Sequence, residues 1–123
     1  MNQGRMIKTA VIGVGYLGRF HAQKFASLPE SELIGVVDIN PEQGKKVSDE
    51  LDVPFYLNFE EVINKVDAVS IAVPTVHHYK SAKAFLANGV HVLLEKPFAE
   101  TIEEAEELAQ LSSDNNVSLQ IGH

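Results

Sequence analysis

Cysteine is absent from this chain of 123 residues, and its absence removes several kinds of chemistry. The protein can have no disulfide framework, no thiolate nucleophile and no cysteine-based metal site. This composition fits a reducing compartment, and we expect a cytoplasmic location. Long hydrophobic runs are also missing. None approaches the roughly 20 residues of a membrane helix, and the polar start lacks a signal-peptide core, so we expect no membrane association.

Positive charge is scarce as well. Ten lysines and arginines stand against 17 aspartates and glutamates, which gives a formal net charge of −7 at pH 7 and argues against nonspecific nucleic-acid binding. The five histidines lack the His-x-x-x-His spacing of a helical metal site, so no metal is expected. We interpret the acidic run from Glu100 to Glu107 as a solvated helix face rather than a partner site.

The chain alternates strand and helix patterns along its whole length, which suits a single domain over residues 1–123. Strands are expected at 6–14, 32–37, 54–56, 68–73, 90–94 and 117–121, and helices at 17–27, 41–52, 59–65, 78–88 and 101–113. Six strands with right-handed helical crossovers predict an α/β doubly wound parallel sheet, the Rossmann fold, in the order 3-2-1-4-5-6. A ligand is then expected at the carboxyl ends of strands one and four, where the order reverses.

Local patterns predict where several helices begin and end. Asn40 is the expected N-cap of a helix with Pro41 in its first turn and Gln43 at the third position. Thr101 opens a capping box, and Gly89 ends a helix in the left-handed conformation. Two helices are expected to bury one stripe each, formed by Leu17, Phe20, Phe25 and Leu28 in the first and by Ile102, Ala105, Leu108 and Ala109 in the last.

A glycine motif, Gly13-x-Gly15-x-x-Gly18, follows the first apolar strand directly. The first glycine makes the tight turn, the second lets a pyrophosphate approach the backbone, and the third lets the helix pack closely on the sheet. Free N–H groups at the helix start, including those of Tyr16 and Leu17, would hold the phosphates. The motif therefore predicts a dinucleotide site, with a purely structural glycine turn as the alternative.

Asp38 follows the second strand about 20 positions after the last glycine, where an acidic residue accepts hydrogen bonds from the adenosine ribose hydroxyls. A carboxylate there repels a 2′-phosphate, and the segment 39–43 offers no arginine to receive one. The sequence therefore predicts NAD rather than NADP. Lys45 and Lys46 are the residues that could reverse this preference.

A lysine follows the fifth strand at the same edge of the sheet. Lys96 lies where a nicotinamide and its substrate would meet, next to Glu95 and before Pro97. A partly desolvated lysine there could hold a substrate hydroxyl and relay its proton. The alternative is an ordinary surface lysine after a strand.

Three motifs together resemble the nucleotide-binding half of the Gfo/Idh/MocA family, named for glucose–fructose oxidoreductase, inositol dehydrogenase and rhizopine catabolism. They are the glycine motif, then Pro74-Thr75 with His78, and then the run 86–92 leading to Glu95-Lys96-Pro97. The resemblance spans essentially the whole chain. It implies an oxidoreductase that exchanges hydride between a nicotinamide and a hydroxyl-bearing carbon of a sugar, cyclitol or related small molecule.

The resemblance also implies roles for residues. Lys96 would be the catalytic lysine, Glu95 would position it or contact the nicotinamide ribose, and the Lys96–Pro97 bond is a candidate cis peptide. His78 would support this site indirectly, or alternatively be a helix-start histidine bonded to backbone, and His77 is expected at the surface. The predicted cofactor-binding set is Gly13, Gly15, Tyr16, Leu17, Gly18, Asp38, Ile39, Val73, Pro74, Thr75, His78, Glu95, Lys96 and Pro97.

One departure from the family affects the functional prediction. Full members carry a second, C-terminal α+β substrate domain with an Asp-x-x-x-His pair, and this sequence contains no such pair. We therefore expect a cofactor domain that binds dinucleotide weakly and catalyses little by itself, from an enzyme that is a homo-oligomer at full length. The alternative is a dinucleotide-sensing module without catalysis. Lys96 favours the enzyme, because a sensor needs no lysine beside the nicotinamide.

Overall fold

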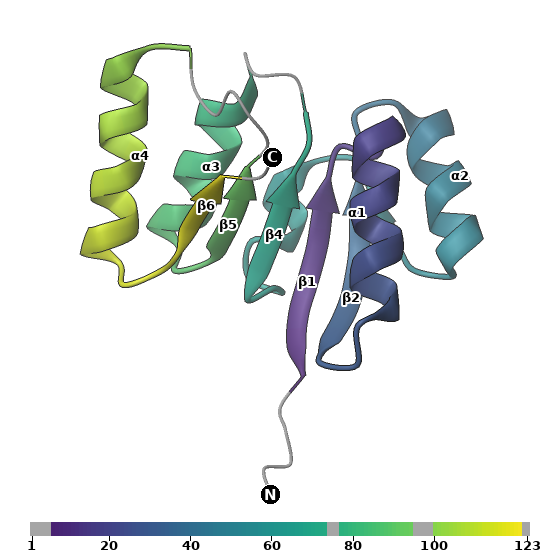
Figure 1. The fold of residues 1–123 in the computed structure, drawn as a ribbon. Helices are drawn as coiled ribbons and strands as arrows, with labels where there is room; N and C mark the ends of the chain where they lie inside the picture. The colour runs from purple at the N-terminus through teal and green to yellow at the C-terminus, as the bar shows by residue number, and fades with distance from the viewer. Residues whose placement is uncertain (1–5, 74–76, 95–99, 122–123) are drawn as a thin grey trace, which may run out of the picture.

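The protein is built on one parallel sheet of six strands in the order β3-β2-β1-β4-β5-β6, which confirms the predicted topology. The computed structural model describes residues 6–73, 77–94 and 100–121 (Figure 1). The strands are β1 (Ile7–Ile12), β2 (Ser31–Val37), β3 (Phe55–Tyr56), β4 (Ala68–Ile71), β5 (His91–Leu94) and β6 (Leu119–Ile121). The helices are α1 (Tyr16–Ser27), α2 (Pro41–Leu51), α3 (His78–Ala87) and α4 (Ile102–Asp114), with a 3₁₀ turn η1 (Phe59–Val62).

Each face of the sheet has its own hydrophobic core. Figure 1 shows α1 and α2 on one side of the sheet and α3 and α4 on the other. The core under α3 and α4 includes the fully buried side chains of Ile71, Phe85, Leu86, Leu94 and Leu108. The core under α1 and α2 is formed by Val11, Val14, Ala22, Leu33, Val36 and Val47. Burying a side chain of this size stabilises the fold by about 1.5–3 kcal/mol.

The predicted helix ends that depend on local chemistry are confirmed. The side chain of Asn40 accepts hydrogen bonds from the N–H groups of Glu42 and Gln43, at 3.0 and 3.3 Å. Thr101 Oγ1 accepts from the N–H of Glu104 at 3.1 Å, but the Glu104 side chain accepts from the N–H of Glu100 at 3.3 Å rather than from that of Thr101, so only the cap of the predicted capping box is confirmed. Gly89 has a φ of 78° after the end of α3. These ends form as predicted because each cap needs only neighbours within one turn.

Several elements are shorter than the sequence patterns suggest. The segment 59–65 forms only the 3₁₀ turn η1, and β3 keeps two residues. Strand β4 ends at Ile71, where it pairs with Ile12 on one side and Leu94 on the other. The ladder stops because the neighbouring strands stop there, which an apolar run in one segment does not reveal.

The two predicted buried stripes are wrong at five positions. Leu17 and Phe20 in α1 are 41% and 57% exposed, and Leu28 is also exposed. The buried residues of α1 are the small Gly18 and Ala22, and of the four predicted side chains only Phe25 packs against the core. In α4, Ile102 is 74% exposed and Leu108 is fully buried, because the first turn of the helix does not contact the core. Ala109 is likewise exposed.

Candidate functional site

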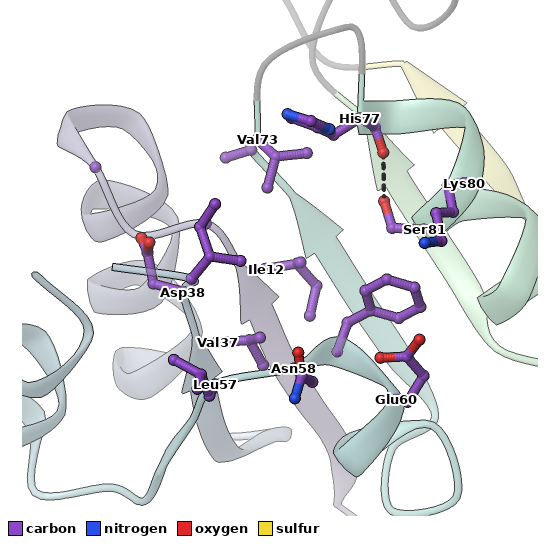
Figure 2. Close-up of a pocket in the computed structure, with 15 residues that line it drawn as sticks. Ile12, Val37, Asp38, Leu57, Asn58, Glu60, Val73, His77, Lys80 and Ser81 are labelled. Carbon is purple, nitrogen blue, oxygen red and sulfur yellow. Dashed lines mark hydrogen bonds between the residues drawn. The ribbon is translucent and has the colours of Figure 1, made fainter. Parts of the chain in front are cut away.

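The candidate site lies at the carboxyl ends of β1, β2 and β4, where the strand order reverses. A cavity of about 570 Å³ opens there (Figure 2). It is lined by Ile12, Gly13, Gly15, Val37, Asp38, Ile39, Leu57, Asn58, Phe59, Glu60, Ala72, Val73, His77, Lys80 and Ser81. Ligands of open α/β sheets bind in this crevice, because crossovers leave the sheet toward opposite faces on its two sides.

The turn after β1 forms one rim of the cavity and needs glycine at its first position. Gly13 has a φ of 89°, a conformation that other residues rarely adopt. Its N–H donates to the carbonyl of Val37 at 2.7 Å, which ties the turn to the end of β2. A Cβ at Gly13 would lie 2.9 Å from Val73 Cγ1 and 3.0 Å from Val73 N. The turn therefore fits between two strand ends only without a side chain.

Gly15 is different, because no contact among the described residues requires a glycine there. Its φ is −65°, and a Cβ built on it meets no heavy atom within 4 Å. It lines the cavity and is the N-cap residue of α1, with no side-chain cap. The missing Cβ leaves open space beside a helix N-terminus, whose N–H groups and dipole favour an anion. This geometry fits a pyrophosphate close to the backbone.

The carboxylate of Asp38 is held by backbone groups on two sides. Asp38 Oδ2 accepts from the N–H of Val14 at 2.9 Å, and Oδ1 accepts from the N–H of Asn40 at 2.8 Å. The side chain is half-buried and lines the cavity. Each carboxylate oxygen has a second acceptor position, so Asp38 can still receive hydroxyl donors from a ligand. Its place beside the glycine turn suits the ribose role that the motif predicts.

Gln43 lies at the third position of α2 but does not complete a capping box there. Asp38 already accepts from the Asn40 N–H, and Gln43 Nε2 instead donates to the carbonyl of Val14 at 2.6 Å. The first turn of α2 is therefore bonded directly to the glycine turn. This contact joins residues 29 positions apart, so no local pattern predicts it.

Helices α1 and α2, which begin beside the cavity, are tied together by a charged pair. Arg19 donates from Nε and Nη2 to the two carboxylate oxygens of Glu50, at 2.8 and 2.7 Å, and Gln23 Nε2 adds a bond at 3.0 Å. The Arg19 hydrogen bond is the main cause that lowers the pKa of Glu50 and, in return, raises the pKa of Arg19. The pair holds the two helices in register at the protein surface.

The structure brings five of the predicted cofactor-binding residues to the cavity, and they are Gly13, Gly15, Asp38, Ile39 and Val73. Gly18 is buried in the first turn of α1 behind Gly13, Tyr16 begins that helix, and Leu17 is exposed beside them. Pro74, Thr75, Glu95, Lys96 and Pro97 lie outside the described residues, and so does the predicted cis bond.

The two adjacent histidines at the start of α3 differ in their surroundings. His78 is 2% exposed, and neither ring nitrogen has a hydrogen-bond partner among residues 6–73, 77–94 and 100–121. The backbone bond expected for a helix-start histidine is therefore absent from that part of the chain. His77 is exposed and lines the cavity, and its carbonyl accepts from Ser81 Oγ at 3.1 Å (Figure 2).

Sequence reasoning missed the far wall of the cavity. It is formed by Leu57, Asn58, Phe59, Glu60, His77, Lys80 and Ser81, from the segment around η1 and from α3. One local feature could have drawn attention to this segment, since the backbone N–H of Asn58 donates to Glu61 Oε2 at 3.1 Å, as in a capping box. The cavity itself arises only when η1 and α3 meet over the sheet.

Metal sites and membrane-spanning helices are both missing from residues 6–73, 77–94 and 100–121. No group of three or more histidine, aspartate or glutamate side chains in that part of the chain could hold a metal ion. None of its helices is long and apolar enough to cross a membrane.

A doubly wound sheet with a glycine turn at its switch point defines a nucleotide-binding Rossmann domain. Residues 7–123 match the family model described as "Oxidoreductase family, NAD-binding Rossmann fold", and the chain therefore belongs to the Gfo/Idh/MocA family. This confirms the resemblance inferred from the three motifs.

Relatives with named activities resemble this chain over most of its length. UDP-N-acetylglucosamine 3-dehydrogenase of Acidithiobacillus ferrooxidans is 44% identical over 117 residues, which cover 95% of this chain and 37% of the relative. Glucose-6-phosphate 3-dehydrogenase of Bacillus subtilis is 33% identical over 100 residues, or 81% of this chain and 29% of the relative. The matched residues thus span only 37% and 29% of the length of these two relatives.

Solved structures agree with the fold. The A. ferrooxidans UDP-N-acetylglucosamine 3-dehydrogenase has a TM-score of 0.92 at 43% identity, over 97% of this chain and 39% of that one. A scyllo-inositol dehydrogenase from Lactobacillus casei, solved with NAD(H) and scyllo-inositol, has a TM-score of 0.89 at 28% identity, over 96% of this chain and 36% of that one. This chain therefore matches only part of each of these two longer dehydrogenases.

Proposed function

We propose that this chain is the cofactor-binding part of an NAD-dependent oxidoreductase acting on a hydroxyl-bearing carbon of a sugar, cyclitol or related small molecule. The nicotinamide, when bound, supplies the hydride acceptor or donor. The observation that carries this proposal is the open space at Gly15, beside the Asp38 carboxylate and at the mouth of the cavity. Sugar and cyclitol dehydrogenases among the relatives support the substrate class.

The chain's own residues divide the binding task. The Gly13–Gly18 turn and the first N–H groups of α1, including those of Tyr16 and Leu17, would bind the pyrophosphate. Asp38 would accept from the adenosine ribose hydroxyls, with Ile39 and Val73 contacting the adenosine portion across the cavity.

We propose NAD as the preferred cofactor. Asp38 places a negative charge where a 2′-phosphate would lie, and it is fixed there by the N–H groups of Val14 and Asn40. Moving the carboxylate away would break two hydrogen bonds, so the repulsion cannot be relieved cheaply. Lys45 and Lys46 are exposed on α2 and are the nearest candidates in sequence to offset it.

The catalytic group that we propose is Lys96. It would orient the substrate hydroxyl and relay its proton, with Glu95 positioning the ammonium group and Pro97 shaping the turn. Pro74 and Thr75 would line the cofactor near its ribose and nicotinamide, with His78 behind them. We also propose a cytoplasmic location and, for the full-length enzyme, a homo-oligomer.

The first test is a pair of titrations of the protein with NADH and NADPH, followed by nicotinamide fluorescence or calorimetry. We expect NADH to bind and NADPH to bind more weakly. Equal binding of both would contradict the NAD preference, and binding of neither would overturn the proposed function. Sequencing the coding region beyond His123 tests whether the full protein is an enzyme. A continuing frame with an Asp-x-x-x-His pair supports catalysis, and a stop codon favours a sensing module.

A further inference from the structure

Two side chains hold the backbone of Val14, the residue between the first two glycines of the turn. Asp38 accepts from its N–H at 2.9 Å, and Gln43 Nε2 donates to its carbonyl oxygen at 2.6 Å. Val14 itself is fully buried in the core under α1 and α2. Its peptide groups are therefore anchored from both sides, although they belong to a turn.

The bond to the Val14 carbonyl has a consequence for the next residue. The carbonyl of Val14 and the N–H of Gly15 belong to one peptide unit, which is planar and trans, so they point in opposite directions. Gln43 thus fixes the direction of the Gly15 N–H by holding the other end of the same unit. Gly15 lies on the cavity side, with open space around it.

In the segment that follows β2, another residue takes the hydrogen bond that Gln43 would accept in a capping box, so the Gln43 side chain is available for the Val14 carbonyl. In a capping box, the side chain at the third helical position accepts from the N–H of the N-cap residue. Here the N–H of Asn40 donates to Asp38 Oδ1, so that position is already filled. Gln43 is half-buried and reaches back 29 positions along the chain to the glycine turn.

We propose that Gln43 is a positioning residue that presents the Gly15 N–H to the pyrophosphate of the dinucleotide without touching the dinucleotide itself. This inference rests on the proposed function, because it requires that the chain bind a dinucleotide. It makes the first turn of α2 part of the phosphate site, while Asp38 serves the ribose from the same segment. Loss of the Gln43 amide would therefore weaken binding of the phosphates and leave binding of the nucleoside unchanged.

The experiment compares Gln43→Met with the unmodified protein, using ADP and adenosine as ligands and calorimetry or NMR titration as the measurement. The methionine side chain has nearly the same length as that of glutamine but carries no N–H donor. We expect the affinity for ADP to fall by up to about tenfold, which corresponds to loss of the Gly15 N–H bond to a phosphate, and the affinity for adenosine to stay the same. The matched control is Gln110→Met, which removes the same amide from an exposed position on α4, where it donates to Asp114 at 2.8 Å.

Each other outcome overturns the inference in a recognisable way. An equal loss for adenosine and ADP would mean that Gln43 acts only through the fold of the segment after β2. An unchanged affinity for ADP would mean that the Gly15 N–H needs no anchor. If Gln43→Met does not fold, Gln43→Ala replaces it, since alanine suits a helix interior. Failure of the unmodified protein to bind both NADH and ADP would instead overturn the proposed function.

Discussion

Gly18 touches the backbone of Gly13 so closely that a Cβ at Gly18 would lie 1.7 Å from the Gly13 carbonyl oxygen. The first turn of α1 rests directly on the turn that leaves β1. The methyl group of Ala72 is also near, at 3.4 Å from the same hypothetical atom. Helix α1 can therefore approach the turn after β1 this closely only because Gly18 has no side chain. The position of the turn at the cavity rim depends on this close approach.

Replacing Gly18 by alanine is expected to destabilise the protein. The new methyl group meets backbone rather than a flexible side chain, so α1 must shift as a body. Overpacking of this kind costs about 1–3 kcal/mol of the free energy of unfolding. Chemical denaturation of Gly18→Ala measures the change, and a midpoint equal to that of the unmodified protein would contradict the close contact.

Gly15→Ala is expected to weaken NADH binding while leaving the stability of the fold nearly unchanged. The backbone conformation at Gly15 accepts alanine and the space around it is open, so the free energy of unfolding should change by less than about 1 kcal/mol. The same methyl group would occupy the space that we assign to the pyrophosphate, so NADH affinity should fall by about tenfold or more. Unchanged NADH affinity in a folded Gly15→Ala protein would argue against a phosphate at this position.

Asp38→Asn is expected to reduce the preference for NAD over NADP. Asparagine keeps an acceptor oxygen for the Val14 N–H but removes the charge that repels a 2′-phosphate. The ratio of NADPH to NADH affinity should rise by about tenfold. Titrating both cofactors against both proteins measures the ratio. A ratio that does not move would show that Asp38 does not face the 2′ position.

The Arg19–Glu50 pair predicts a pH-dependent contribution to stability. Hydrogen bonds from Arg19 and then Gln23 lower the pKa of Glu50, so the folded state favours the charged carboxylate. The contribution is complete above the ordinary glutamate pKa and is lost as the pH falls through the lowered value in the folded protein. The effect should be small, because both side chains are partly exposed, at 43% and 32%.

Thermal unfolding of Glu50→Gln at several pH values tests this. The variant should melt below the unmodified protein at about pH 7, and the two curves should converge once the pH falls below the lowered pKa of Glu50 in the folded protein. The matched control is Glu32→Gln, which removes an exposed carboxylate from β2. The difference in melting temperature between this control and the unmodified protein should not change with pH in the same way. A gap that persists at low pH would assign the effect to helix packing rather than to charge.

Much of the fold follows from chemistry that acts over a few residues. The Asn40 cap, the Thr101 cap and the left-handed Gly89 were all predicted, because each depends on neighbours within one helical turn. The strand order was predicted because alternating strands and helices with right-handed crossovers leave few topologies open. The buried face of α1 was not predicted correctly, since Gly18 and Ala22 are buried while Phe20 is exposed.

The sequence by itself determined the class of site, because a glycine turn after a strand and an acid after the next strand meet at one edge of any doubly wound sheet. Only the tertiary structure decided how that site is assembled. Packing brought η1 and α3 over the strand ends to close the cavity, and it placed Gln43 against Val14 and Arg19 against Glu50. These contacts join segments far apart in the chain, and their geometry depends on how closely the helices approach the sheet, which no local pattern encodes.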